Sequence, residues 1–278
     1  MRKINSVFAA VLALVMLAGL GACVGGGDSG SPGNGSNVPS DDANEIRLTN
    51  TEGLLIMATS ADFPPYEFYE GGQIVGIDAE IAGAIAEKLG LELRIDDMDF
   101  GAIIPAITSG RADIGMAGMT VRPDREENVN FSVSYATGVQ VVVVREGSEI
   151  TSVDDLFEVG AHFDIAVQEA TTGDIYATDD LEDEGLATIH RFRRGGDAIL
   201  ALTSGRVDCV IIDNEPAKAF IESNSGLVIL DTEYAVEDYA IAIGKDNNTL
   251  LEAVNNALHE IKADGTAARI VNKYITAD

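Results

Sequence analysis

The chain has 278 residues, with 46 aspartates and glutamates against 18 lysines and arginines, so its formal net charge at pH 7 is −28. A chain this acidic, with no cluster of basic residues, is excluded from nucleic-acid binding, whose affinity comes from neutralising phosphates. Its two cysteines, Cys23 and Cys209, cannot build a disulfide framework, and we expect Cys209, inside an apolar strand, to be a buried thiol.

The N-terminal segment has the composition of an export signal. Two basic residues precede an unbroken apolar and glycine stretch at 7–20, and the sequence Leu-Gly-Ala-Cys that ends at Cys23 is similar to a lipoprotein processing site. We therefore expect residues 1–22 to be a lipoprotein signal peptide and Cys23 to carry a lipid anchor. The alternatives are an ordinary cleaved signal and a short membrane anchor.

Residues 23–45 consist almost wholly of Gly, Ser, Asn, Asp and Pro. Such a segment buries too little apolar surface to fold, so we expect a flexible tether. The body that follows, about 230 residues, suffices for one two-lobed unit or two small domains. It has no segment long and apolar enough to span a membrane. These features predict an exported body, lipid-anchored to a membrane and facing a periplasm or the open medium.

Strands and helices are predicted to alternate through the body. A strand at 54–59 leads into an aromatic and proline-rich loop at 62–68, and Asp78 is expected to cap a helix that ends before Gly90. The later elements are a strand at 91–95, a helix at 102–107, a strand at 114–117, a β-branched run at 131–144, a short helix after Ser152, a strand at 165–168, a helix after Thr172, a strand at 188–192, a helix at 198–202, a strand at 209–212, a helix after Pro216, strands at 228–230 and 239–243, and helices at 248–263 and 266–274. This alternation predicts an α/β fold with mainly parallel sheets covered by helices.

One hexapeptide pattern, Thr-Ser-Gly-Arg-x-Asp, occurs twice, at 108–113 and at 203–208. Each copy joins an apolar helical run to an apolar strand. Its glycine, Gly110 or Gly205, stands where a helix needs a residue that tolerates positive φ in order to end. Ligands of open α/β sheets bind beyond the carboxyl ends of the strands. Two matching units therefore predict two lobes that close on one small ligand.

Several longer motifs follow one another through the body. They are Ala-Thr-Ser-Ala-Asp-Phe-Pro-Pro-Tyr-Glu-Phe at 58–68, Val-Gly-Ile-Asp at 75–78, Asp-Phe-x-x-Ile-Ile-Pro-Ala at 99–106, Ala-Gly-Met-Thr-x-x-Pro-x-Arg at 117–125, Val-Gln-x-x-Thr-Thr at 167–172, Asp213, and Asp-Gly-Thr at 264–266. In this order they resemble the family 3 extracellular solute-binding proteins, the polar-amino-acid receptors of ABC importers. The resemblance covers essentially all of residues 46–274.

The resemblance implies a type II periplasmic-binding-protein fold. Lobe 1 would consist of 46–134 plus 240–278 and lobe 2 of 139–236, joined by two crossover strands with hinges near 134–138 and 236–240. The implied ligand is a free amino acid, and the implied partner is the membrane permease of an ABC importer. We expect a monomer that needs no cofactor and no metal.

The resemblance also implies which residues hold the amino acid. Arg125 would bind the carboxylate, since a guanidinium is a planar, permanently charged and bidentate donor. The backbone N–H groups of Thr120 and Thr172 would complete that shell, and the carbonyl of Gly118 and the carboxylate of Asp213 would accept the ammonium. Residue types alone leave two alternatives, Arg125 as a surface ion pair and Asp213 as a helix cap.

The resemblance assigns four more residues to the ligand's carbon skeleton and side chain. Phe63 and Phe100 would sandwich the skeleton, and a core position is the alternative for Phe100. Ser60 and Gln168 stand where family members vary with the ligand. Members that take cationic side chains often have an acid at the place of Ser60, so its hydroxyl favours an uncharged or small polar ligand. Ala170 departs from the family's usual glycine, and its Cβ could tighten the loop near the carboxylate.

A periplasmic lyase of the prephenate or arogenate dehydratase type, on the same fold, is the alternative function. It would need a positioned acid or base in the cleft, and His162, His190 and His259 fall at positions typical of structural or exposed residues. No nucleophile elbow, phosphate loop or zinc spacing is present. The acidic run at 179–184 lacks the alternating ligands and central glycine of a calcium loop. We therefore expect a binding protein and not an enzyme.

Overall fold

A computed structural model describes residues 48–275, which lie within one compact unit, residues 46–278. The expected signal peptide, the expected tether and Cys23 lie outside the described residues. Within 48–275, no helix combines the length and the apolar character that a membrane crossing needs.

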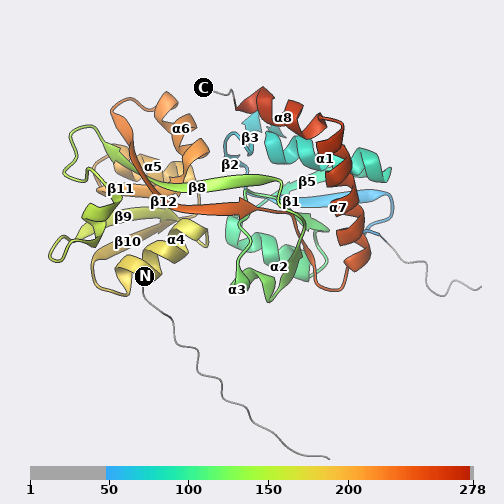
Figure 1. The fold of residues 1–278 in the computed structure, drawn as a ribbon, viewed down its shortest axis with the longest axis horizontal. Coiled ribbons are helices and arrows are strands. Elements are labelled where there is room, and N and C mark those ends of the chain that lie inside the picture. The colour runs from blue at the N-terminus through green and yellow to red at the C-terminus, as the bar shows by residue number, and fades with distance from the viewer. Residues whose placement is uncertain (1–47, 276–278) are drawn as a thin grey trace, which may run out of the picture. The chain divides into compact units, whose positions relative to one another are not determined.

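Two five-stranded sheets form the body (Figure 1). The first has the order β5 (Glu92–Asp97), β1 (Leu54–Thr59), β6 (Ile114–Gly115), β13 (Ala242–Gly244) and β7 (Val129–Phe131). β1 pairs in parallel with β5 and β6, whereas β13 pairs antiparallel with β6 and β7. The first sheet is therefore mixed, with its parallel part at one side and its antiparallel part at the other.

The second sheet has the order β10 (Ala187–Phe192), β9 (Phe163–Gln168), β11 (Cys209–Asp213), β8 (Ala136–Arg145) and β12 (Leu227–Tyr239). β9 pairs in parallel with β10 and β11, and β8 pairs antiparallel with β11 and β12. The strand directions thus repeat those of the first sheet, neighbour by neighbour. This is the repeat of architecture that the two hexapeptides predict.

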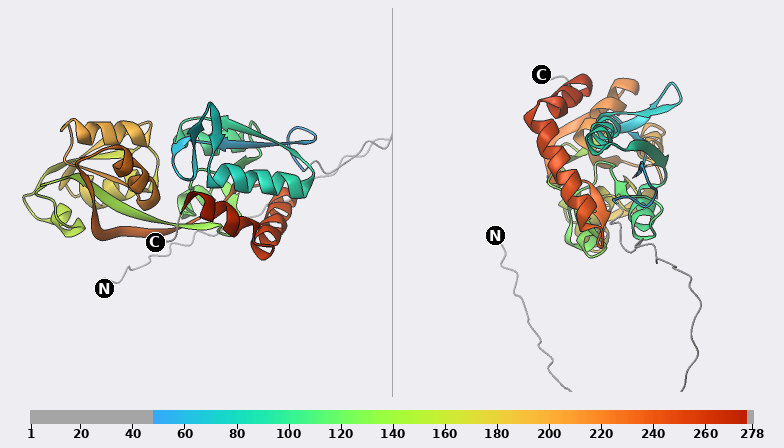
Figure 2. Two further views of the ribbon diagram at one scale, coloured as in Figure 1. Left: turned by 90° about the horizontal axis from the view of Figure 1, so that it is seen from above. Right: turned by 90° about the vertical axis from the view of Figure 1, so that its right-hand side faces the viewer.

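The long strands β8 and β12 connect the two lobes (Figure 2). They pair antiparallel from Ala136 opposite Tyr239 to Arg145 opposite Leu227, with irregular register between Ile229 and Ala235. β8 follows β7 of the first sheet, and β12 leads back to β13. In the second sheet the crossing strand β8 is the one that runs against its neighbours β11 and β12. In the first sheet that role falls to β13, which follows the crossing strand β12 in the chain.

Helices cover both sheets, and a small third sheet lies beside the first. The remaining elements are β2 (Asp62–Phe63), β3 (Glu67–Glu70), β4 (Gln73–Val75), α1 (Ile77–Leu89), η1 (Phe100–Ala102), α2 (Ile103–Thr108), α3 (Pro123–Glu126), η2 (Val153–Phe157), α4 (Thr172–Ala177), the π-helical turn η3 (Thr178–Glu182), α5 (Gly195–Thr203), α6 (Asn214–Ser223), α7 (Asn248–Ala263) and α8 (Thr266–Tyr274). α1 packs against α7 and α8. Fully buried Ile81 and Ile85 on α1 and Leu258 and Ile261 on α7 belong to one core cluster, and side chains of this size each contribute about 1.5–3 kcal/mol when buried.

The hexapeptides have the same structural role in both lobes. Gly110 and Gly205 both have φ of 73°, the left-handed conformation expected of them. The carboxylate of Asp113 accepts the N–H of Ile56 on β1 at 2.8 Å, and that of Asp208 accepts the N–H of Asp164 on β9 at 2.9 Å. Each aspartate therefore fixes its hexapeptide to the neighbouring parallel strand.

The prediction that Asp78 caps α1 is wrong. The helix begins at Ile77 after Gly76, and the carboxylate of Asp78 makes no capping bond. It is fully buried and accepts the N–H of Gly118 at 3.0 Å and the hydroxyl of Tyr135 at 2.7 Å. A buried amide at the end of β6 needs an acceptor, and Asp78 supplies it.

The final strands also differ from the prediction. β12 extends to Tyr239, and β13 begins only at Ala242. The polar stretch 231–238 hides this strand in the sequence, because β12 lies at the edge of the second sheet and many of its residues are exposed. The predicted helices 248–263 and 266–274, by contrast, are confirmed as α7 and α8.

Candidate functional site

A cavity lies between the lobes, where strands of both sheets end. With the lobes in this position the cavity is nearly filled, with a volume of about 10 Å³. Its lining consists of Ser60, Phe63, Glu67, Phe100, Ala117, Gly118, Gln168, Thr171, Thr172 and Asp213. This set includes every ligand-binding residue that the sequence predicts except Thr120 and Arg125. Residues from both lobes contribute to the lining.

Arg125 lies beside the cavity as a buried cation. Pro123 starts the short helix α3, and the Arg125 side chain leaves it toward Phe100, with the guanidinium carbon 5.2 Å from the ring centre. Nη1 donates to the carbonyl of Thr120 at 2.9 Å and Nη2 to that of Ala170 at 3.2 Å. Within residues 48–275 no carboxylate lies within 4 Å of it, so the surface-ion-pair alternative is wrong. Burial lowers the pKa of Arg125 to about 10.

Asp213, at the end of β11, is a buried acid in the cavity lining. Its carboxylate accepts Nε2 of Gln140 at 2.7 Å and the hydroxyl of Tyr239. It stands at the first turn of α6 but makes no capping hydrogen bond there, so the helix-cap alternative is wrong. Burial, with the charge of Glu237 adding to it, raises the pKa of Asp213 to about 8. A carboxylate in this position is stabilised by any cation that reaches it.

Thr120 and Thr172, one from each lobe, meet beside Arg125. Their hydroxyls lie 3.4 Å apart and donate to the same oxygen of Glu237, at 3.1 Å and 2.8 Å. Glu237 lies on β12, one of the crossing strands, and is 6% exposed. The sequence gives no hint of this role, because Glu237 sits in the polar stretch that hides the strand. Glu237 thus links both lobes to the crossing strand.

Glu67 is a second acid in the cavity that sequence reasoning missed. It is fully buried on β3, and neither carboxylate oxygen has a hydrogen-bond partner within the described structure. Burial, then the neighbouring carboxylate of Asp78, raises its pKa well above the usual range. Local sequence gave no signal for this burial, because Glu67 follows Tyr66 and precedes Phe68, and successive side chains on a strand point to opposite faces.

The apolar wall of the cavity has two phenylalanines. Phe63, 7% exposed, packs at 5.9 Å between ring centres against Tyr66, and Phe100, 9% exposed, also belongs to the core of the first lobe. Phe100 therefore both lines the cavity and packs in the core, the two roles considered for it from the sequence. Gly118 has φ of 52°, and a Cβ there would lie 2.8 Å from the Phe63 ring. Only glycine lets this backbone pass beneath the aromatic wall.

The far end of the cavity is closed by polar contacts between the lobes. Nε2 of Gln168 lies 3.5 Å from the hydroxyl of Ser60. Arg194, another residue that sequence reasoning missed, binds both carboxylate oxygens of Asp97 at 3.1 and 3.2 Å and lies 3.5 Å from Asp62. The guanidinium of Arg194 also lies 3.5 Å from the Ser60 hydroxyl. This end is therefore held shut by partly buried ion pairs that join the second lobe to the first.

Known proteins match this chain over the whole body. The family model of the bacterial extracellular solute-binding proteins, family 3, matches residues 55–277. The arginine-binding extracellular protein ArtP of Bacillus subtilis (strain 168) is 34% identical over 227 residues, which is 81% of this chain and 87% of that protein.

Two solved structures are similar as well. An ancestral arginine-binding protein bound to arginine has a TM-score of 0.75 and 38% identity, over 80% of this chain and 98% of that one. An ancestral arginine-binding protein bound to glutamine has a TM-score of 0.76 and 37% identity, over 82% of this chain and 100% of that one. With the two mixed sheets, these likenesses confirm the predicted α/β, type II periplasmic-binding-protein fold.

Proposed function

The chain belongs to the bacterial extracellular solute-binding proteins of family 3, and from that membership we propose that it binds one free amino acid between its lobes. The bound amino acid is delivered to the membrane permease of an ABC importer. As a member of an extracellular family, the protein works outside the cytoplasm. It acts as a monomer with two lobes that move against each other. Lobe 1 consists of residues 46–134 plus 240–278 and lobe 2 of residues 139–236, and the hinges lie near 134–138 and 236–240.

One observation carries this proposal. Among residues 48–275, a buried aspartate without a cation partner lines the cavity, and a buried arginine without a carboxylate partner lies beside it. Isolated buried charges are costly, and each is stabilised by a counter-charge. An α-amino acid brings both at once, its carboxylate for Arg125 and its ammonium for Asp213. The backbone N–H groups of Thr120 and Thr172 and the carbonyl of Gly118 complete the two shells.

A third buried acid in the cavity, Glu67, favours a basic amino acid, and we propose arginine. Among residues 48–275 neither oxygen of Glu67 has a hydrogen-bond partner, and a guanidinium, whose charge favours ionised Glu67, supplies several N–H donors in a planar fork that fits a carboxylate. ArtP of Bacillus subtilis is named as arginine-binding, and so is the ancestral protein. The argument from the Ser60 hydroxyl for an uncharged ligand is outweighed, because Glu67 provides an acid from a different strand. Phe63 and Phe100 cover the methylene chain.

We propose that the protein binds without catalysis. His190 pairs with Asp164 at 2.8 Å, the His162 ring lies 3.0 Å from the hydroxyl of Thr188, and His259 is exposed on α7. None of the three lines the cavity. Incubation with prephenate or arogenate is expected to leave both unchanged, as followed by chromatography. Turnover that is lost in Asp213→Asn would establish the lyase instead.

Ligand identity is tested by a melting-temperature screen of the twenty common amino acids, followed by calorimetry. Arginine should raise the melting temperature most, since a ligand that binds only the folded state stabilises it by mass action. Small-angle scattering should give a smaller radius of gyration at saturating arginine, because the lobes close on it.

Glu67→Gln should weaken arginine binding about tenfold to a hundredfold, which is the value of a hydrogen bond to a charged group.

Glutamine and Glu70→Gln provide the controls. Glu67→Gln should change the affinity for glutamine less than it changes the affinity for arginine. The side chain of the ligand glutamine carries no charge that could pair with Glu67. Glu70, three residues along β3, is exposed, so Glu70→Gln should bind arginine like the unchanged protein. Tighter binding of an uncharged amino acid would reject arginine while keeping the receptor function. Binding of no amino acid at all would reject the receptor function itself.

We propose that residues 1–22 are removed as a signal peptide, that Cys23 carries a lipid and that residues 23–45 tether the body. Cys23→Ser should move the protein from the membrane fraction to the soluble exported fraction, because one thioether-linked lipid group is lost. Ligand affinity should stay the same, since Cys23 precedes the folded body. Ser31→Ala, in the same segment, should remain with the membrane. Mass spectrometry of the mature N-terminus decides, and an unlipidated Cys23 would show an ordinary signal.

A further inference from the structure

The loop between β9 and α4 adopts an unfavoured backbone conformation at one residue. Ala170 has φ of 65°, and within residues 48–275 it is the sole non-glycine residue with positive φ. Residues with a Cβ seldom adopt this left-handed conformation. The carbonyl of Ala170 accepts Nη2 of Arg125 from the first lobe, and its methyl faces Gly101 of that lobe. The unfavoured conformation is therefore part of the contact between Arg125 and the second lobe.

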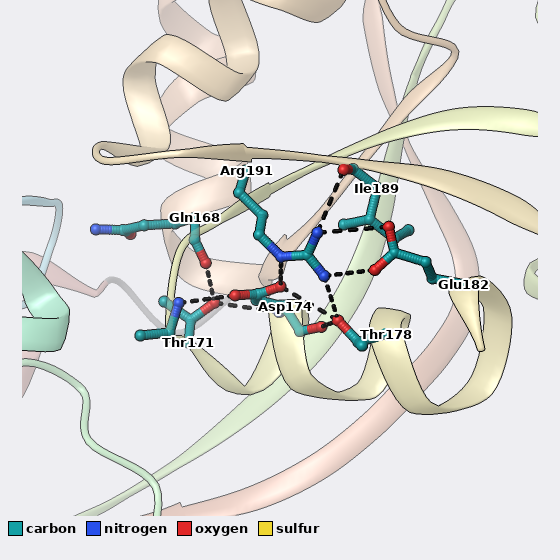
Figure 3. Close-up of polar contacts among 8 residues, drawn as sticks. Gln168, Thr171, Asp174, Thr178, Glu182, Ile189 and Arg191 are labelled. Atoms are coloured by element: carbon teal, nitrogen blue, oxygen red, sulfur yellow. Dashed lines mark hydrogen bonds and ion pairs between the residues drawn. The ribbon is translucent and has the colours of Figure 1, made fainter.

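Asp174 binds the loop at this position from the first turn of α4 (Figure 3). Its Oδ2 accepts the N–H of Ala170 at 2.9 Å, and its Oδ1 accepts Nε of Arg191 at 2.8 Å. The Asp174 side chain is 10% exposed. Beside it, the hydroxyl of Thr171 donates to the carbonyl of Gln168 at 2.8 Å. The loop that carries Gln168, Thr171 and Thr172 into the cavity is thus held at both ends by this network.

Arg191 orients Asp174 from the neighbouring strand β10. Its Nη2 donates to the hydroxyl of Thr178 at 2.7 Å and to Glu182 at 2.6 Å, both on the π-helical turn η3. The outer contact with Glu182 is partly exposed and does not touch the loop. The guanidinium therefore has two separable roles, one toward Asp174 and one toward the surface turn.

We propose that Asp174 is a positioning residue for ligand binding. It acts on the ligand site through Ala170, and Arg191 fixes the orientation of the Asp174 carboxylate. By accepting the Ala170 N–H, Asp174 keeps that residue left-handed, so that the carbonyl reaches Arg125 and the N–H of Thr172 stays at the carboxylate shell. The proposal rests on the proposed amino-acid site. It extends that site to two residues that do not line the cavity.

The test is a suppressor experiment on the full chain, with arginine as ligand and calorimetry as the measurement. Asp174→Ala should weaken binding about tenfold to a hundredfold, the range for losing a hydrogen bond to a charged group. Ala170→Gly in the same chain should restore most of that loss, because glycine adopts φ near 65° without support. Glycine at φ near 65° also relieves strain in the folded chain, so affinities are compared at a temperature where melting curves show both variants fully folded. A residue that acted only through overall stability would leave the affinity of the folded protein unchanged.

Glu182→Gln is the matched control, because it removes the outer contact of Arg191 and leaves the contact between Asp174 and Ala170. It should bind arginine like the unchanged protein, even if its melting temperature falls. Unaltered binding in Asp174→Ala, or a loss that Ala170→Gly does not restore, would overturn the proposal.

Amide hydrogen exchange at Ala170 separates this proposal from the proposed function. The amide should be protected in the unchanged protein and lose protection in Asp174→Ala, whether or not a ligand is present. An unchanged protein that binds no amino acid, but shows this loss, would reject the amino-acid site while keeping the hold of Asp174 on the loop. Equal exchange in both proteins would overturn the positioning role directly.

Discussion

Replacing Arg125 by lysine is expected to weaken amino-acid binding by about 2 to 5 kcal/mol, the cost of breaking a buried, hydrogen-bonded charge pair. The charge is retained, but a lysine ammonium lacks the planar fork of donors. In the structure the guanidinium already donates to the carbonyls of Thr120 and Ala170 while lying against the Phe100 ring. Within the described part of the chain its other N–H groups have no partner and can bind a carboxylate. An ammonium has three donors against five in a guanidinium, so after contacting both carbonyls it cannot bind a carboxylate through two N–H groups.

Calorimetry with arginine measures this loss, and Arg122→Lys serves as the matched control. Arg122 lies three residues earlier and pairs at 2.9 Å with Asp124, with side chains 17% and 54% exposed, and its guanidinium carbon lies 5.2 Å from the centre of the Tyr176 ring. Each of these contacts contributes about 1 kcal/mol, and a lysine at this position keeps the charge for both. Its replacement should leave affinity nearly unchanged. Equal affinities for Arg125→Lys and the unchanged protein would remove Arg125 from the ligand site.

The helical part of the fold could be predicted from the sequence because local signals determine it. α7 and α8 have the predicted bounds, and between them Gly265, with φ of 79°, breaks the helix after Asp264. The two hexapeptides likewise end helices through glycine and return to a strand. In each of these places the glycine that ends the helix and the apolar pattern that predicts it lie within a few residues of one another in the sequence.

The acids around the cavity could not be predicted in the same way. Glu237 is buried because β12 pairs with β8 and because Thr120 and Thr172 approach it from separate lobes. Glu67 pairs with Phe63 on β2 and lies beside Asp78 on α1. No periodicity within either segment records these contacts, which arise only when distant segments pack together. The positions of Arg125 and Asp213 came from motifs that a family resemblance supplies, and their burial is a finding of the structure.

Asp213→Asn is expected to weaken binding of the α-amino acid about tenfold to a hundredfold, because the charge-assisted part of the bond to the ammonium is lost. The des-amino analogue has no ammonium, so its affinity should stay the same or improve. The variant should remain folded. The raised pKa means that native Asp213 keeps its proton between about pH 4 and pH 8 while the unfolded chain loses it, so this group costs stability as the pH rises. An amide removes that cost, and the melting temperature at pH 8 should not fall.

The pH dependence of binding gives the same test a second measurement. The ammonium pairs with ionised Asp213, so affinity of the unchanged protein for the amino acid should fall as the pH drops below about 8, where Asp213 takes up its proton. The fall approaches tenfold per pH unit, because one proton must leave for each ligand bound. Calorimetry from pH 6 to 9 should show a much smaller change in Asp213→Asn, leaving only the contribution of Glu67. If both ligands weakened equally and the melting temperature fell, Asp213 would be a structural residue and the ammonium site would lie elsewhere.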